Sequence, residues 1–66
     1  MKLIVNNKET EVKDGCTVAE LAEQLTLPDK GIAIAANNKM IPRQEWINKV
    51  LQPGDNLVVI KAACGG

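Results

Sequence analysis

The first residues of the chain have the pattern of two short strands joined by a tight turn. Residues 2–5 (Lys-Leu-Ile-Val) are β-prone, and residues 6–8 (Asn-Asn-Lys) suit a hairpin turn. Residues 9–12 (Glu-Thr-Glu-Val) continue as a second strand whose polar positions face water, and Asp14-Gly15 ends it. The pattern therefore predicts an N-terminal β-hairpin.

An amphipathic helix is predicted after this hairpin. Thr17 is a natural N-cap, and Glu20 lies three residues later, which is the spacing of a capping box. Apolar residues recur at helical spacing and form one stripe: Val18, Leu21, Ala22 and Leu25. Because Pro28 disfavours helical geometry in the residue before it, we expect the helix to end near Leu25–Leu27.

A second group of strands follows the helix. Large and small side chains alternate over residues 32–36, which predicts a strand with Ile32 and Ile34 on its inner face. Residues 37–39 (Asn-Asn-Lys) turn the chain, and residues 40–41 form a brief return strand. This segment is therefore a second, shorter hairpin.

The last predicted strand is apolar at every position. Residues 43–49 indicate a short helical turn and residues 53–55 (Pro-Gly-Asp) a tight turn, after which residues 57–60 are Leu-Val-Val-Ile. A continuous apolar strand is typical of the middle of a sheet, with both faces at least partly covered. Residues 62–66 (Ala-Ala-Cys-Gly-Gly) carry no hydrophobic bulk and indicate a free tail.

The order of these elements predicts an α+β protein with the β-grasp (ubiquitin-like) fold. A helix between two hairpin-like halves can pack on one face of a single sheet if the first and last strands lie side by side. Their pairing is then parallel. We expect a mixed sheet of four to five strands with one main helix on one face, in a domain spanning residues 1–62. Residues 63–66 would be a flexible C-terminal tail ending in Gly-Gly.

The composition excludes several kinds of chemistry. A chain of 66 residues forms one domain. The absence of His excludes imidazole catalysis and His-ligated metals, and two Cys cannot supply a Cys₄ metal site. Eight basic residues balance eight acidic ones, and Phe and Tyr are absent, so we expect no nucleic-acid partner.

The sequence also contains no pattern for export or membrane insertion. The apolar run after Lys2 covers only residues 3–5, far short of a signal-peptide core. Nothing approaches the roughly 18 apolar residues of a membrane span. Cys16 and Cys64 therefore indicate free thiols in a reducing compartment. We expect a cytoplasmic protein with no membrane partner.

The sequence ends in Gly65-Gly66, which offers a carboxylate on a thin stalk. Glycine lacks Cβ and is permissive in φ, so such a stalk can enter a narrow channel. Its terminal carbonyl is uncrowded and therefore open to nucleophilic attack. A frayed end without function is the alternative interpretation. On a β-grasp domain of this size we favour a functional carboxylate.

Several motifs, in this order, resemble one family over essentially the whole chain. They are Thr17-Val18-x-x-Leu21, Pro42-Arg43-x-x-Trp46, Pro53-Gly54-Asp55 and Gly65-Gly66. Together with the chain length, they resemble the ThiS family of sulfur carrier proteins of thiamine biosynthesis, within the ubiquitin-like MoaD-ThiS group. The resemblance implies a β-grasp fold and a covalent carrier that is not itself an enzyme.

The resemblance also implies a cycle of reactions at the carboxylate of Gly66. An adenylating enzyme of the ThiF type activates Gly66 with ATP, and sulfur from a donor such as a cysteine desulfurase replaces AMP to give a thiocarboxylate. Thiazole synthase, of the ThiG type, then takes the sulfur for the thiazole ring. The residues agree with this division of labour, because the chain has neither a phosphate loop nor a general base. We expect it to bind no cofactor or metal itself.

Four other side chains are candidates for chemistry or partner contact. Cys64 stands where the family resemblance leads us to expect another small residue, so we interpret it as a tail residue. The alternative is a thiol that reacts with activated Gly66 or with a partner. Cys16 indicates a structural or incidental thiol. We expect Arg43 to be solvated, and Trp46 to pack in the core or as a lid, because it is the largest apolar group.

One face of the sheet is predicted to bind a partner protein. Strand alternation places one set of side chains beneath the helix: Leu3, Val5, Leu57 and Val59. Ile4, Val58 and Ile60 then meet on the uncovered face, beside Ala33 and Ala35. A bare apolar patch near the base of the tail would be a docking site. Shielding by long side chains or by the segment after the second hairpin is the alternative.

Three other functions share parts of this pattern. The related carrier of the molybdopterin pathway has the same tail chemistry, but the short chain and residues 42–46 favour the thiamine pathway. A ubiquitin-like modifier would form isopeptide adducts with lysines. A non-covalent interaction domain would keep its function after deletion of Gly65-Gly66.

Overall fold

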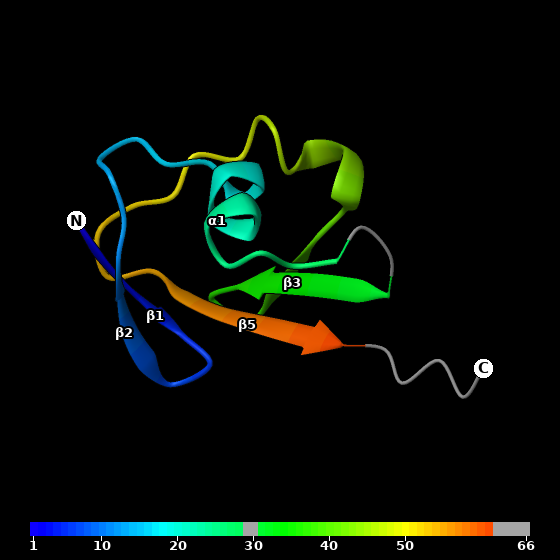
Figure 1. The fold of residues 1–66 in the computed structure, drawn as a ribbon, viewed down its shortest axis with the longest axis horizontal. Helices are drawn as coiled ribbons and strands as arrows, with labels where there is room; N and C mark the ends of the chain where they lie inside the picture. The colour runs from blue at the N-terminus through cyan, green and yellow to red at the C-terminus, as the bar shows by residue number, and fades with distance from the viewer. Residues whose placement is uncertain (29–30, 62–66) are drawn as a thin grey trace.

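The computed structural model describes residues 1–28 and 31–61, which form one five-stranded sheet with a helix on one of its faces (Figure 1). The elements in chain order are β1 (Lys2–Val5), β2 (Lys8–Glu11), α1 (Val18–Gln24), β3 (Ile32–Ala36), β4 (Lys39–Ile41), the 3₁₀ turn η1 (Arg43–Glu45) and β5 (Asn56–Lys61). The strands lie in the order β2-β1-β5-β3-β4. β5 is therefore the central strand, as its apolar sequence predicts.

The sheet is mixed, and its one parallel pair joins the first and last strands. β1 and β5 run parallel, while the pairs β1–β2, β3–β4 and β3–β5 are antiparallel. This arrangement confirms the predicted β-grasp topology. The tail predicted for residues 63–66, with Cys64, Gly65 and Gly66, lies outside the described residues.

The turn of each hairpin consists of two asparagines with positive φ. Asn6 and Asn7 have φ values of 50° and 67°, and Asn37 and Asn38 have 51° and 69°. Two-residue hairpin turns with positive φ at both central positions match the strand twist, and Asn tolerates that conformation better than most residues. The lysine that follows each pair was predicted to be part of the turn, but in each case it is the first residue of the return strand. β2 therefore spans Lys8–Glu11 and not residues 9–12.

The predicted capping box begins α1. The Thr17 hydroxyl accepts a hydrogen bond from the Glu20 N–H at 3.1 Å, and the Thr17 N–H donates to Glu20 Oε1 at 3.0 Å. Each bond satisfies a backbone donor that the first helical turn leaves unpaired. The helix ends at Gln24 with Leu25 as its C-cap, as expected upstream of Pro28. The helix start and stop signals in the sequence are therefore confirmed.

Replacing Thr17 with Ala is expected to lower the free energy of unfolding by about 1 kcal/mol, because the side-chain half of the capping box is lost. Chemical denaturation measures the change. Thr17→Ser is the matched control, since it retains the hydroxyl. Equal losses in the two variants would show that the methyl group, rather than the cap, carries the stabilisation.

An exposed ion pair lies beside the capping box. Lys13 Nζ is 2.6 Å from Glu20 Oε2. This hydrogen bond, together with the one from the Thr17 N–H, lowers the pKa of the Glu20 carboxyl. A lowered folded-state pKa stabilises the fold above the ordinary carboxyl pKa, and that contribution is lost as the pH falls through the folded value. Solvent screening keeps the contribution small because both side chains are exposed.

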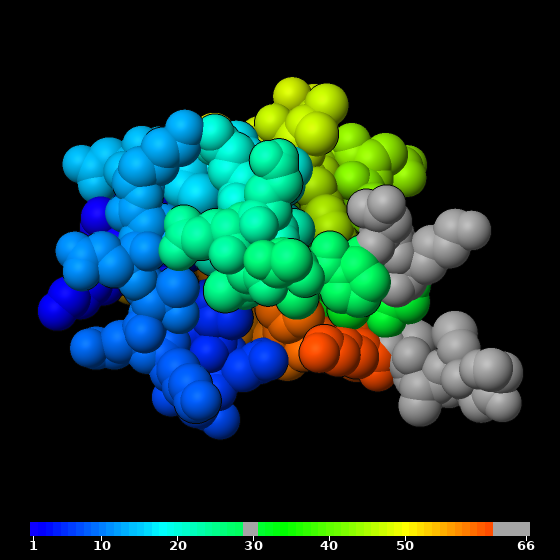
Figure 2. All heavy atoms as spheres, in the orientation of Figure 1, coloured from blue at the N-terminus to red at the C-terminus, as the bar shows by residue number. Residues whose placement is uncertain are grey.

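The core lies between α1 and one face of the sheet. Leu3, Leu21 and Leu57 are completely buried, and Val59 is half-buried against the same cluster. Trp46 is 5 % exposed, and its indole N–H donates to the Ile41 carbonyl at 3.0 Å. Figure 2 shows α1 (cyan) and the segment after β4 (yellow) above the strand β5 (orange). The predicted inner face and the packing role of Trp46 are both confirmed.

Residues 1–28 and 31–61 contain no helix that is long and apolar enough to cross a membrane. The α-helix found there has only 7 residues, and neither its length nor its apolar content suits it to cross a bilayer.

Candidate functional site

The face of the sheet opposite α1 carries exposed apolar side chains. Val58 is 40 % exposed and Ile60 is 46 % exposed, whereas Leu57 of the same strand, β5, is completely buried. α1 therefore covers only one face of β5, although the apolar run predicts at least partial cover on both. An apolar run specifies a central position in the sheet, but it cannot distinguish a second covering layer from a surface left for a partner.

Strand register brings the predicted face residues together. Ala33 lies opposite Ile60, and Ala35 lies opposite Val58 across the β3–β5 pair. Ile4 is half-buried on the neighbouring strand β1, where it lies opposite Asn56 of β5 and diagonal to Val58. Directly opposed residues share one face of a sheet. The predicted grouping of Ile4, Val58 and Ile60 on one face is therefore confirmed.

Met40 extends this surface and was not among the predicted residues. It is 58 % exposed and lies opposite Ala35 across the β3–β4 pair. The two-residue turn at Asn37-Asn38 determines this register, so the sequence did hold the signal. We call the six residues of this surface the open-face patch: Ile4, Ala33, Ala35, Met40, Val58 and Ile60. Methionine adapts its shape to different partners, which suits it to a docking surface.

The open-face patch lies at the base of the C-terminal segment. Ile60 belongs to it, and Lys61 is the last residue of β5 (Figure 1). The predicted carrier residue Gly66 lies outside the described residues, five positions beyond Lys61. A fully extended chain of that length spans at most about 18 Å. A partner that covers the patch at Ile60 therefore lies beside the point where the chain leaves β5.

Side chains suited to metal binding do not cluster in the described part of the chain. Within residues 1–28 and 31–61, no group of three or more His, Cys, Asp or Glu side chains could hold a metal ion. Cys16 is 2 % exposed, and burial raises the pKa of its thiol, so little reactive thiolate forms at neutral pH. This environment agrees with a structural thiol.

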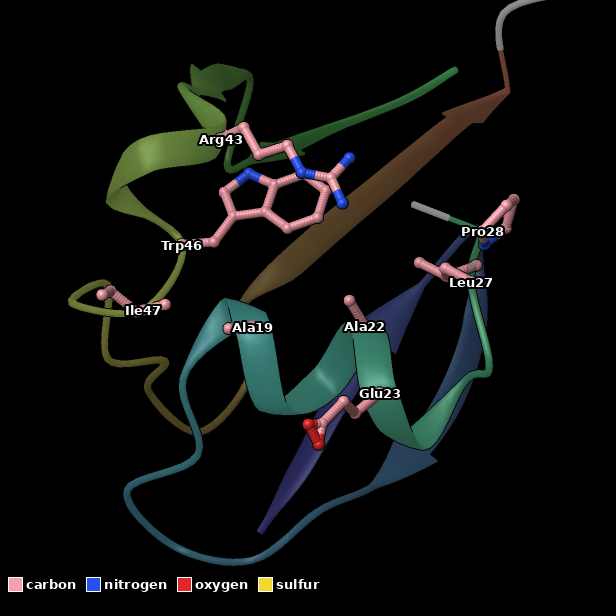
Figure 3. Close-up of a pocket in the computed structure, with 8 residues that line it drawn as sticks. All are labelled: Ala19, Ala22, Glu23, Leu27, Pro28, Arg43, Trp46 and Ile47. Carbon is pink, nitrogen blue, oxygen red and sulfur yellow. The ribbon is translucent and has the colours of Figure 1, made fainter. Parts of the chain in front are cut away.

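Arg43 is not simply solvated, as the sequence led us to expect. Its guanidinium carbon lies 4.8 Å from the centre of the Trp46 ring (Figure 3). The one-turn spacing across η1 places the cation over the indole face, where the ring quadrupole attracts it. Arg43 therefore covers the buried Trp46, a contact that neither residue type alone predicts.

A shallow cavity of about 260 Å³ lies beside this pair, between α1 and the segment that follows β4. Its lining residues are Ala19, Ala22, Glu23, Leu27, Pro28, Arg43, Trp46 and Ile47 (Figure 3). It lies in the helical layer, so the sheet separates it from the open-face patch. The protein thus has two separate surface features with different composition.

Comparison with known proteins finds one family that matches nearly the whole chain. The sequence profile of the ThiS family matches residues 2–66. The chain is 33 % identical, over 66 residues and the full length of both proteins, to the sulfur carrier protein ThiS of Escherichia coli (strain K12). It is also 26 % identical over 66 residues to a thiazole synthase of Paramagnetospirillum magneticum (strain ATCC 700264 / AMB-1), of which it covers only 20 %.

Solved structures support the fold. The crystal structure of the thiamine biosynthesis protein ThiS from Geobacter metallireducens superposes with a TM-score of 0.86 over 100 % of both chains, at 23 % identity. A solution structure of a thiamine biosynthesis protein from the same organism gives 0.81, covering 100 % of this chain and 88 % of the other. The described topology is therefore the β-grasp topology of these structures.

Proposed function

Since this chain belongs to the ThiS family, we propose that Gly66 is the residue on which it carries sulfur, as a C-terminal thiocarboxylate. The chain is a sulfur carrier of thiamine biosynthesis and not a catalytic enzyme. The observation that supports Gly66 is that the ThiS family match covers residues 2–66 and so includes Gly66. Glycine at that position leaves the reacting carbonyl uncrowded.

The proposed chemistry divides into activation and sulfur transfer. The Gly66 carboxylate attacks the α-phosphorus of ATP, pyrophosphate leaves, and an acyl-adenylate forms. A sulfur nucleophile then attacks the carbonyl carbon and expels AMP. When the nucleophile is a persulfide, as from a cysteine desulfurase, a thiol reductant must also cleave the resulting acyl disulfide. ATP binds to the adenylating enzyme, so this chain acts as its protein substrate.

The recipient that we propose for the sulfur is thiazole synthase. The thiazole synthase of Paramagnetospirillum magneticum supports this partnership, because a fifth of its length aligns with this entire chain. Joining a carrier-like segment to the acceptor enzyme would raise the local concentration of the carrier at the enzyme's active site. Where carrier and acceptor are not joined in one chain, a docking surface would have to supply that proximity.

The docking surface that we propose for the adenylating enzyme, of the ThiF type, is the open-face patch. Val58, Ile60 and Met40 offer exposed apolar area near the start of the reactive segment. Apolar patches of this kind on small domains often mark protein interfaces. We place these events in the cytoplasm, where ATP and reduced thiols are both abundant.

Intact-mass spectrometry tests the proposed function. The purified chain is incubated with a ThiF-type adenylating enzyme, ATP and a sulfur source that includes a thiol reductant. We expect a mass gain equal to the difference between one sulfur and one oxygen atom, with fragmentation placing it on Gly66. Omission of ATP is the control and should leave the mass unchanged. Isopeptide adducts on lysines of other proteins, without the sulfur gain, would instead indicate a modifier.

A further inference from the structure

Backbone pairing between β1 and β5 ends well before β5 itself ends. The last paired residues are Val5 and Leu57, and the Asn6 N–H then donates to the Leu57 carbonyl at 2.9 Å. β1 turns away at Asn6, whereas β5 continues to Lys61. The end of β5 nearest the C-terminal segment would therefore have an unpaired backbone edge on this side.

The side chain of Asn6 occupies that edge. Its Oδ1 accepts from the Val59 N–H at 2.8 Å, and its Nδ2 donates to the Val59 carbonyl at 3.4 Å. These are the two backbone groups that a longer β1 would have paired. A carboxamide has the same donor and acceptor as a peptide unit, so Asn6 acts as one more residue of β1. We call this pair of bonds the Asn6 clamp.

The other edge of β5 is paired to its end. β3 runs antiparallel to it, and Ile32 lies opposite Lys61. With the Asn6 clamp, β5 is held on both edges as far as Val59, only two residues before the chain leaves the sheet. Two-sided pairing restricts the twist and bending of a strand more than pairing on one edge.

We propose that Asn6 is a positioning residue for the reactive C-terminus. By holding Val59, it fixes the direction in which β5 leaves the sheet, and so orients the base of the segment that carries Gly66 while the open-face patch is docked. This inference rests on the proposed carrier function. Alignment of a reacting group before the chemical step raises the rate of that step, because less conformational entropy is then lost on reaching the transition state.

The chain provides its own matched control at the opposite end of β5. Asn37 Oδ1 accepts from the Asn56 N–H at 3.0 Å, and its Nδ2 donates to Asp55 Oδ1 at 3.1 Å. Asn37, like Asn6, has positive φ and begins a hairpin turn. Its bonds hold the start of β5, far along the strand from the C-terminal segment. Its loss should cost comparable stability without changing where Gly66 is directed.

The experiment compares Asn6→Gly with Asn37→Gly. Glycine keeps the positive φ of each turn and removes the side chain that carries the carboxamide. For Asn6→Gly we expect amide exchange at Val59 to quicken about tenfold, since its hydrogen-bond acceptor is gone. Adenylation by the ThiF-type enzyme, followed as pyrophosphate release, should show kcat reduced about fivefold with KM for the carrier nearly unchanged. Asn37→Gly should leave both kcat and Val59 exchange near the wild-type values.

Asn6→Asp provides a partial rescue. Aspartate keeps the acceptor for the Val59 N–H but loses the donor to the Val59 carbonyl. We expect its kcat to lie between those of Asn6→Gly and the wild type.

Equal kcat values for Asn6→Gly and Asn37→Gly would overturn the positioning role and leave Asn6 a structural residue. Unchanged Val59 exchange in Asn6→Gly would overturn the clamp itself. Both results are distinct from a failure of the proposed function, in which the wild-type chain would not be adenylated at all. That failure would remove the positioning role as well, while exchange at Val59 in the free chain would still report on the clamp.

Discussion

Deleting Gly65 and Gly66 is expected to reduce thiocarboxylate formation at least a hundredfold. The deletion moves the terminal carboxylate back to Cys64, and displacement of a reacting group by even about 1 Å can cost about a hundredfold in rate. The described fold ends at Lys61, so the free energy of unfolding should change by less than about 0.5 kcal/mol. Intact mass measures the first effect, and chemical denaturation measures the second.

Gly66→Ala separates position from crowding at the carrier residue. It keeps the carboxylate at its original distance from the fold and adds one methyl group beside the reacting carbonyl. We expect impaired adenylation with the fold intact. Normal sulfur transfer by Gly66→Ala would remove the steric argument for glycine. Normal function of the deletion variant would remove the carrier role and favour a non-covalent interaction domain.

Replacing Ile60 with Glu is expected to weaken binding to the adenylating enzyme by about 2 kcal/mol or more, roughly thirtyfold in Kd. Ile60 is 46 % exposed in the free chain, so its replacement leaves the core beneath α1 unchanged. In the complex, the introduced carboxylate would be buried without a partner, which is strongly unfavourable. Titration with the partner enzyme measures Kd, and thermal unfolding measures stability.

Two variants serve as controls for Ile60→Glu. Ile60→Thr keeps a β-branched side chain and should bind with an intermediate Kd. Leu57→Ala removes a completely buried side chain from the opposite face and should lower the free energy of unfolding by about 2–5 kcal/mol. If Ile60→Glu unfolds the chain as Leu57→Ala does, Ile60 belongs to the core. Unchanged Kd with unchanged stability would remove the open-face patch from the interface.

Much of this fold follows from local rules. The capping box at Thr17 and Glu20 and the two asparagine turns each depend on residues close together in sequence. Helical and strand periodicity then assigns side chains to faces, so Leu3 and Leu57 could be placed in the core and Ile60 outside it. Right-handed crossover of the first and last strands leaves few ways to connect such elements, and the β-grasp topology follows. The order of motifs and the terminal glycines pointed to the carrier role.

Contacts between distant residues depended on the tertiary structure. Asn6 and Val59 are separated by 53 positions, and their hydrogen bonds exist only because β1 ends early beside β5. No local pattern distinguishes Asn6, as a turn residue, from Asn7. Arg43 and Trp46 are close in sequence, but their stacking also depended on the tertiary structure, which buries the indole. Periodicity therefore determined which side chains face inward, while the relative lengths of paired strands decided which polar groups meet across the sheet.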